Sequence, residues 1–72
     1  MFGSKARELE EIKKEIDINL QNNYKSVAHE KRKLLGLRAE ELYQAGKIQE
    51  KEYKRYIRIF DEYTEMMKDY HH

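Results

Sequence analysis

The side chains that could carry catalysis are few, because the chain has no cysteine and only three histidines. His29 could act as a general base or a metal ligand, but the residues four positions away are Lys25 and Lys33, which cannot share a metal with it. The terminal pair His71-His72 lacks the fixed geometry that a metal site needs. We therefore predict that the protein is not an enzyme and has no metal site or cofactor.

Carboxylates gather in two groups that could attract a hard cation. The first comprises Glu8, Glu10, Glu11, Glu15 and Asp17, and the second comprises Asp61, Glu62, Glu65 and Asp69. Neither contains an oxygen-rich loop with a glycine turn of the calcium-binding type. Glu10 precedes Lys14 by four residues, a spacing that supports a helix by a few tenths of a kcal/mol. We interpret both groups as solvated helix surface.

Basic residues form the clearest charge feature. If the chain folds back at Gly46, two helices of equal rise place residue i opposite roughly residue 92 − i, so that Arg38 faces Lys54. This register predicts a patch for phosphate or for an acidic protein surface, made of Arg32, Lys33, Arg38, Lys54, Arg55 and Arg58. A solvated face is the other interpretation. The basic residues on the C-terminal side of Gly46 lie opposite the aromatic face of their helix, so charge and stacking are not interleaved. These residues are Lys51, Lys54, Arg55 and Arg58.

Tyrosines repeat every seven residues at Tyr56, Tyr63 and Tyr70, with Tyr53 and Phe60 beside them. Such a row could stack on nucleic-acid bases. A seven-residue step also keeps the rings on one seam between helices, where the ring bodies are buried and the hydroxyl groups reach the wet rim. We predict the seam.

The elements that must position these residues are helices, because the chain has no proline and is rich in Glu, Lys, Arg, Leu and Gln. A long first helix over about residues 5–45 is predicted by an apolar stripe that keeps its helical phase. Its members are Leu9, Ile12, Ile16, Leu20, Tyr24, Val27, Leu34, Leu35, Leu42 and Ala45. Gly36 and the pair Asn22-Asn23, followed by Ser26 as a candidate N-cap, weigh against one unbroken helix.

The chain is expected to turn at Gly46, which can adopt the left-handed conformation that closes a helix while Ile48 packs back over the last turn. A second helix follows over about residues 49–70. Its apolar face consists of Tyr53, Tyr56, Ile57, Phe60, Tyr63, Met67 and Tyr70. The predicted fold is therefore an all-α antiparallel helical hairpin.

The two predicted arms differ in length, roughly 60 Å against roughly 33 Å. The first arm then overhangs the second, and a protein interface, most simply with a second copy of the chain, would cover the overhang. That interface consists of Leu9, Ile12, Ile16 and Leu20. The alternative is a three-helix bundle broken near Asn22-Asn23, in which the same four residues belong to the core.

The segment from Leu42 to Tyr53 resembles the short helical hairpin of the SHOCT family. In both, a leucine-bearing helix ends in Gly, here Gly46, and is followed by a β-branched residue and an acidic and aromatic helix start. The family has Thr or Ser as N-cap where this chain has Gln49. The resemblance implies a small oligomerisation module of the kind that is appended to other proteins.

Length and composition narrow the function. At 72 residues the chain is one domain, 1–72, with residues 1–4 and 71–72 expected to be flexible or left over from cloning, and a chain this short is marginally stable alone. A net charge of +1 excludes a globally basic polyanion binder. Without cysteine, and with apolar runs such as Leu34-Leu35 far shorter than about 20 residues, we expect a cytoplasmic protein with no membrane segment.

We predict a protein-interaction or oligomerisation module. The alternative is a nucleic-acid or nucleoprotein-binding accessory protein, such as a mobile-element adaptor or inhibitor, that uses the basic patch.

Overall fold

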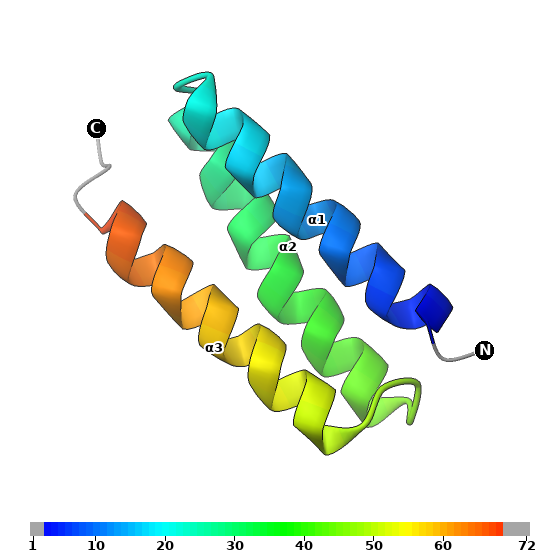
Figure 1. Ribbon diagram of the computed structural model, residues 1–72. Helices are drawn as coiled ribbons and strands as arrows, with labels where there is room; N and C mark the ends of the chain where they lie inside the picture. Colours follow the sequence, from blue (N-terminus) through cyan, green and yellow to red (C-terminus); the bar gives the residue numbers. More distant parts are fainter. Residues whose placement is uncertain (1–2, 69–72) are drawn as a thin grey trace.

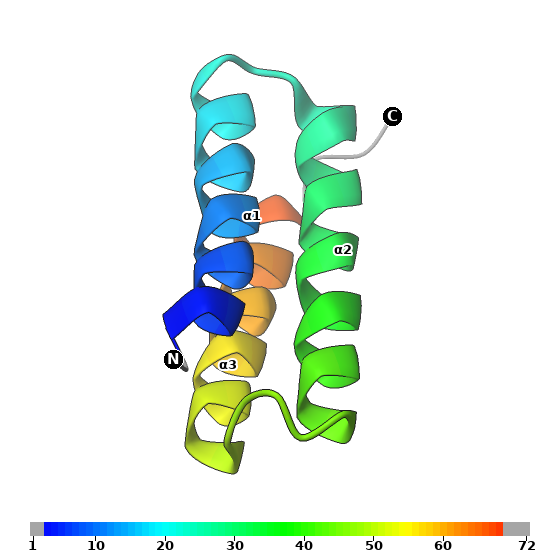
Figure 2. The ribbon, with the colours of Figure 1, turned by 90° about the vertical axis from the view of Figure 1, so that its right-hand side faces the viewer.

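Three helices run up, down and up again through residues 3–68, the part of the chain that this computed structural model describes (Figure 1). They are α1 (Gly3–Gln21), α2 (Lys25–Gln44) and α3 (Glu50–Met67). Figure 2 shows α1 and α2 side by side with α3 behind them. The all-α prediction is confirmed, and the alternative of a three-helix bundle is the architecture observed. The unbroken helix over residues 5–45 is wrong.

The chain breaks after Gln21 because Asn23 adopts the left-handed conformation, with φ of 64°. The backbone N–H of Tyr24 donates to the carbonyl of Asn19 at 2.8 Å, and that of Asn23 donates to Leu20 at 3.1 Å. These two bonds form the Schellman motif that closes a helix. The left-handed conformation costs asparagine less free energy than it costs most other residues with a side chain. A reversal at Asn23 also returns both apolar stripes to one core, so the continuous phase did not require one helix.

The N-cap of α2 is not the predicted Ser26 but Tyr24. Tyr24 is the N-cap residue, its side chain makes no capping hydrogen bond, and Ser26 lies inside the helix. Ser26 is therefore not the N-cap.

The turn at Gly46 is confirmed. Gly46 has φ of 74°, its N–H donates to the carbonyl of Tyr43, and the N–H of Lys47 donates to Leu42 at 2.8 Å, which completes a second Schellman motif. Ile48 is buried, as expected from packing over the last turn of α2. At the start of α3 the carboxylate of Glu52 accepts a hydrogen bond from the backbone N–H of Gln49 at 3.2 Å.

The hydrophobic core lies between all three helices. Its buried members are Leu9, Ile12, Ile16, Ala28, Leu35, Ala39, Leu42, Ile48, Tyr56, Tyr63 and Met67. Because α1 folds back along α2, the predicted overhang does not exist. Leu9, Ile12 and Ile16 are buried within the chain and Leu20 packs against them, so these four residues do not form an exposed interface.

The apolar face of α3 is confirmed for the described residues. Besides the buried Tyr56, Tyr63 and Met67, the side chains of Tyr53, Ile57 and Phe60 are partly buried against the core. Tyr70 and His71-His72 lie outside the described residues, as do Met1 and Phe2.

The register of α2 against α3 differs from the expected one by about one helical turn. The rings of Tyr43 and Tyr53 stack with centroids 4.4 Å apart, so residue i lies opposite about 96 − i. Gly36 lies where the two helices approach closely: a Cβ at this position would lie 2.9 Å from the ring of Phe60. The missing side chain of Gly36 therefore leaves room for the Phe60 ring between α2 and α3, and Gly36 does not interrupt α2.

Candidate interaction surface

The seam between α1 and α3 is joined by tyrosine and carboxylate side chains. The hydroxyl of Tyr56 donates to Glu10 Oε2 at 2.6 Å, and that of Tyr63 donates to Asp17 Oδ1 at 2.5 Å. Both pairs join residues 46 positions apart. The seven-residue spacing of the tyrosines therefore matches that of the two carboxylates, and α1 and α3 run parallel along the seam.

These hydrogen bonds change the acidity of the two phenols. Burial of the ring is the larger cause and the hydrogen bond to Glu10 the second, and together they raise the pKa of Tyr56 to about 12. The pKa of Tyr63 is raised further for the same reasons, with Asp17 as its acceptor. Both hydroxyls are therefore protonated donors at neutral pH. The prediction that the tyrosine rings are buried on a seam between helices is confirmed for this pair. Their hydroxyls, which were expected to reach the wet rim, donate instead to Glu10 and Asp17, and these acceptors were not foreseen.

Three hollows follow the exposed side of α3 next to this seam. The first, about 620 Å³, is lined by Gly46, Lys47, Ile48, Gln49, Lys51, Glu52 and Arg55. The second, about 430 Å³, is lined by Lys51, Lys54, Arg55, Arg58, Ile59 and Glu62. The third, about 200 Å³, is lined by Lys13, Asp17, Ile59, Glu62, Tyr63 and Met66. Successive hollows share lining residues, so together they form one shallow depression, which we name the α3 groove.

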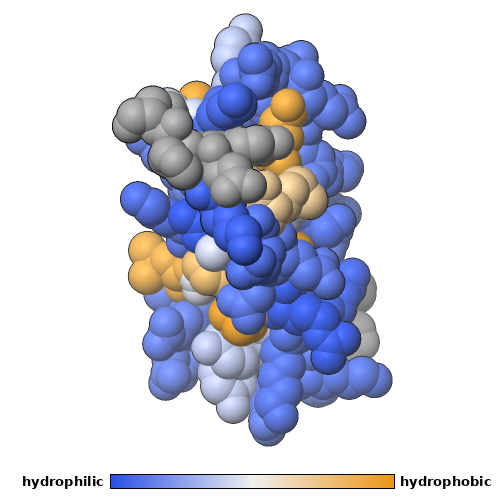
Figure 3. All heavy atoms as spheres, turned by 90° about the vertical axis from the view of Figure 1, so that its left-hand side faces the viewer, coloured by the Kyte–Doolittle hydropathy of each residue, from blue (hydrophilic) through white to orange (hydrophobic). Residues whose placement is uncertain are grey.

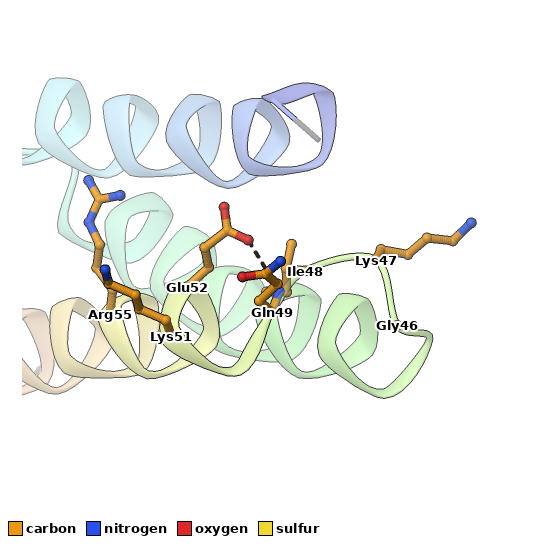
Figure 4. Close-up of a pocket in the computed structure, with 7 residues that line it drawn as sticks. All are labelled: Gly46, Lys47, Ile48, Gln49, Lys51, Glu52 and Arg55. Atoms are coloured by element: carbon orange, nitrogen blue, oxygen red, sulfur yellow. Dashed lines mark hydrogen bonds between the residues drawn. The ribbon is translucent and has the colours of Figure 1, made fainter. Parts of the chain in front are cut away.

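The α3 groove is basic near the turn and mixed in charge at its other end. Five cations and two carboxylates line the first two hollows. Figure 4 shows Glu52 and Arg55 reaching from α3 toward α1, while Lys47 extends away from the turn. Lys54 pairs with Glu50 at 3.0 Å and Arg55 lies 3.7 Å from Glu10.

Three of the groove's cations are both exposed and free of ion pairs. Within residues 3–68, the side chains of Lys47, Lys51 and Arg58 are exposed and have no ion-pair partner. Their charges are not offset by a neighbouring carboxylate within ion-pair distance. The floor between them includes the apolar side chains of Ile48 and Ile59.

The surface around the groove is mostly hydrophilic. Figure 3 views the molecule from the side on which α3 lies, and its hydrophobic atoms form separate small patches among hydrophilic ones. Met66 is 56% exposed at the far end of the groove. A ligand of this face would therefore meet charge first and small apolar contacts second.

The predicted polyanion patch is divided by the fold. Lys54, Arg55 and Arg58 line the groove on α3, while Lys33 is exposed on α2 and lines none of the three hollows. The α2 and α3 residues do not form the single patch that the sequence predicted, because Arg32 and Arg38 of α2 are engaged in contacts between helices.

Arg38 is held on the opposite side of α2, against α1. Its guanidinium donates to both carboxylate oxygens of Glu8, at 2.6 and 2.9 Å, and to Glu41 at 2.7 Å. These hydrogen bonds raise the pKa of Arg38 above its ordinary value. Arg38 is thus engaged within the bundle and does not face Lys54.

Arg32 is engaged between α2 and α3. Its Nη1 donates to Thr64 Oγ1 at 3.0 Å, and its guanidinium carbon lies 5.3 Å from the centre of the Phe60 ring, within cation–π range. The side chain is half-buried. Arg32 and Arg38 therefore do not belong to a free polyanion patch, because both are half-buried and stabilise contacts between helices.

The other side chains that could carry chemistry form no site within residues 3–68. No group of three or more His, Asp or Glu side chains within residues 3–68 could hold a metal ion. His29 is half-exposed on α2, and no helix in that range is long and apolar enough to cross a membrane. The α3 groove, by contrast, brings several free charged groups together around a hollow.

Comparison of the chain with protein-family models, curated proteins and solved structures gives no match.

Proposed function

We propose that the protein is a non-enzymatic interaction module that binds an acidic segment of another protein along the α3 groove. The observation that supports this most is the joined row of hollows in which Lys47, Lys51 and Arg58 are exposed and unpaired. Free cations can form charge-assisted hydrogen bonds with carboxylates of a partner directly, whereas cations already paired within the chain would first have to give up their partners.

The length and floor of the groove favour a helical or extended peptide. The row runs along α3 from Lys47 to Met66, about 28 Å at the rise of a helix. Ile59 and Met66 lie along it and offer contacts to apolar side chains of the partner. An acidic amphipathic segment matches both features, with carboxylates over the basic end and apolar residues toward Met66.

Nucleic acid is the competing ligand for the same cations. Phosphates would use Lys51 and Arg58, but base stacking requires exposed aromatic faces, and the rings of Tyr56 and Tyr63 are buried in the core. Apolar side chains in the floor also contribute nothing to phosphate binding. These features favour a protein ligand.

Fluorescence anisotropy with a labelled acidic amphipathic peptide of about four helical turns tests the proposal. We expect Lys51→Glu and Arg58→Glu each to weaken binding by at least about fivefold, since loss of an attraction of about 1 kcal/mol alone is about fivefold and the repulsion adds to it. Lys33→Glu is the matched control, because it changes the net charge equally on an exposed site outside the groove, and it should change affinity less than twofold.

The same titration also tests whether nucleic acid is the preferred ligand. Unlabelled single-stranded DNA of equal charge should displace the peptide only weakly. Absence of peptide binding at low salt contradicts the proposal, as does equal weakening by Lys33→Glu. Stronger binding of DNA than of peptide, lost in Lys51→Glu and Arg58→Glu, would assign the groove to nucleic acid.

A further inference from the structure

The two turns of the bundle use the same hydrogen bonds but different residues at the left-handed position. After α2 this position is Gly46, whereas after α1 it is Asn23. Any side chain makes the left-handed conformation less favourable than it is for glycine. The α2 start is also weak, because its N-cap Tyr24 provides no side-chain hydrogen bond. The Asn22–Tyr24 turn is therefore the less firmly closed of the two.

The apolar stripe of α1 continues through that turn at helical spacing. Leu20, Tyr24 and Val27 would lie on one face if residues 3–44 formed one helix. In the bundle the side chains of Tyr24 and Val27 are instead 60% and 40% exposed. The sequence thus carries an apolar face across the turn that the closed monomer does not cover.

The register of α1 against α2 is symmetric about the turn. Glu8 pairs with Arg38, and Glu15 pairs with Lys31 at 3.1 Å, so in both pairs the residue numbers sum to 46. Two identical straight helices that cross antiparallel at residue 23 have the same register. Every α1–α2 contact can therefore form between two chains related by a twofold axis.

We propose that the chain also forms a domain-swapped dimer with a second copy, in which residues 3–44 are one continuous helix. The α1 segment of each chain then packs on α2 and α3 of the other. The hydrogen bonds of Tyr56 with Glu10 and of Tyr63 with Asp17 become contacts between chains. The exchange is isologous and closed, so it ends at the dimer.

The swapped dimer removes three unfavourable features of the monomer's first turn. Asn23 returns to a helical conformation, the uncapped start of α2 disappears, and Tyr24 and Val27 of both chains meet at the crossing. Association entropy opposes these gains, so the dimer fraction depends on concentration. The α3 groove is present in both forms, with α1 supplied by the partner in the dimer, so this inference does not rest on the proposed function.

Light scattering after size-exclusion chromatography, over a range of concentrations, tests the inference with a matched pair of variants at one exposed site. Asn23→Gly stabilises the left-handed turn, and Asn23→Ala favours the continuous helix. We expect the dimer dissociation constant of Asn23→Ala to be at least about tenfold lower than that of Asn23→Gly, with the unmodified chain between them. Monomers at every concentration for the unmodified chain and for Asn23→Ala, or equal constants for the two variants, would overturn the inference.

A cross-linking experiment separates a swapped dimer from side-by-side association. The chain has no cysteine, so Glu15→Cys with Lys31→Cys places two unique thiols across the α1–α2 contact. In the isolated dimer fraction, a short bis-maleimide should join these thiols between chains and give a covalent dimer on a denaturing gel. Links within single chains only would refute the swap even if the protein dimerises. In the monomer fraction the same reagent should link them within one chain.

Discussion

At the residue scale, the bundle uses tyrosine where a simpler core would use leucine. Tyr56 and Tyr63 fill the space between α1 and α3 with their rings and direct their hydroxyls to Glu10 and Asp17. A buried hydroxyl without an acceptor would be unfavourable, so the carboxylates determine that α1 lies beside α3 in this register. The same residues therefore contribute to burial and to the choice of partner helix.

The raised pKa values predict how stability depends on pH. The phenols titrate near 10 in the unfolded chain, and Tyr56 near 12 in the folded chain, so the folded state retains these protons more strongly. Their stabilisation is complete below about pH 10 and is lost as the pH rises from about 10 through about 12. Stability should therefore fall steeply in this alkaline range.

Thermal melting of the unmodified chain and of the double variant Tyr56→Phe with Tyr63→Phe measures this effect. The variant should melt lower at about pH 8, because Glu10 and Asp17 lose their donors, and the difference should shrink toward about pH 12. Lysine deprotonation affects both proteins alike and cancels in the comparison. A difference that stays constant over this range would contradict the assigned hydrogen bonds.

Arginines of the sequence-predicted patch should fall into two classes. Arg38→Gln should lower the melting temperature, because Glu8 and Glu41 lose their shared partner, and should leave acidic-peptide affinity nearly unchanged. Arg58→Gln should do the reverse, since Arg58 is exposed and has no partner within residues 3–68. Melting curves and anisotropy titrations of both variants check this, and equal effects on stability would contradict the division of the patch.

At the element scale, each turn is closed by one residue with positive φ. Both follow a helix whose last carbonyls are satisfied by the Schellman hydrogen bonds. The glycine at position 46 could be recognised in the sequence from its type together with Ile48, which can pack back over the last helical turn. Asparagine at position 23 could be recognised only as a candidate, because asparagine also occurs within helices.

Gly46 offers a direct test of the turn, since a Cβ there would have no atom within 4 Å. Gly46→Ala should therefore destabilise the fold by the backbone cost alone, about 1 kcal/mol, or roughly 4–8 °C in melting temperature for a domain of this size. Gly46→Asn is the control and should lose less, because asparagine tolerates the left-handed conformation. An alanine variant that melts with the unmodified chain would mean that the turn has a different conformation.

The sequence alone predicted the helical class, the Gly46 turn and the apolar face of α3, because periodicity and glycine report local structure. It did not decide between one and two helices before Gly46, since Leu20, Tyr24 and Val27 keep phase in either case. The patch failed for a tertiary reason. Arg38 binds Glu8 on α1 and Arg32 contacts Thr64 and Phe60 on α3, and no local signal in the sequence encodes these contacts between helices.

At the scale of the whole molecule, the bundle is long and thin, with Cα extents of 38 × 18 × 14 Å over its principal axes. Such a shape leaves room for surface depressions but little for an enclosed active site. On α1, Glu8 and Glu15 pair with Arg38 and Lys31, and Glu10 and Asp17 accept hydrogen bonds from the seam tyrosines. Along α3, by contrast, several exposed cations of the groove have no ion-pair partner within residues 3–68. This asymmetry is the basis for proposing the α3 groove as the binding face.

The most direct test of this account is a nuclear magnetic resonance titration of the isotope-labelled protein with the acidic amphipathic peptide. We predict that backbone amide shifts change along the groove, at Lys47, Lys51, Arg55, Arg58 and Ile59, and at Lys13 across the seam, while Lys33 and Leu37 on the outer side of α2 stay unchanged. Shift changes centred on α2, or no changes at saturating peptide, would contradict the claim that the α3 groove is the binding site.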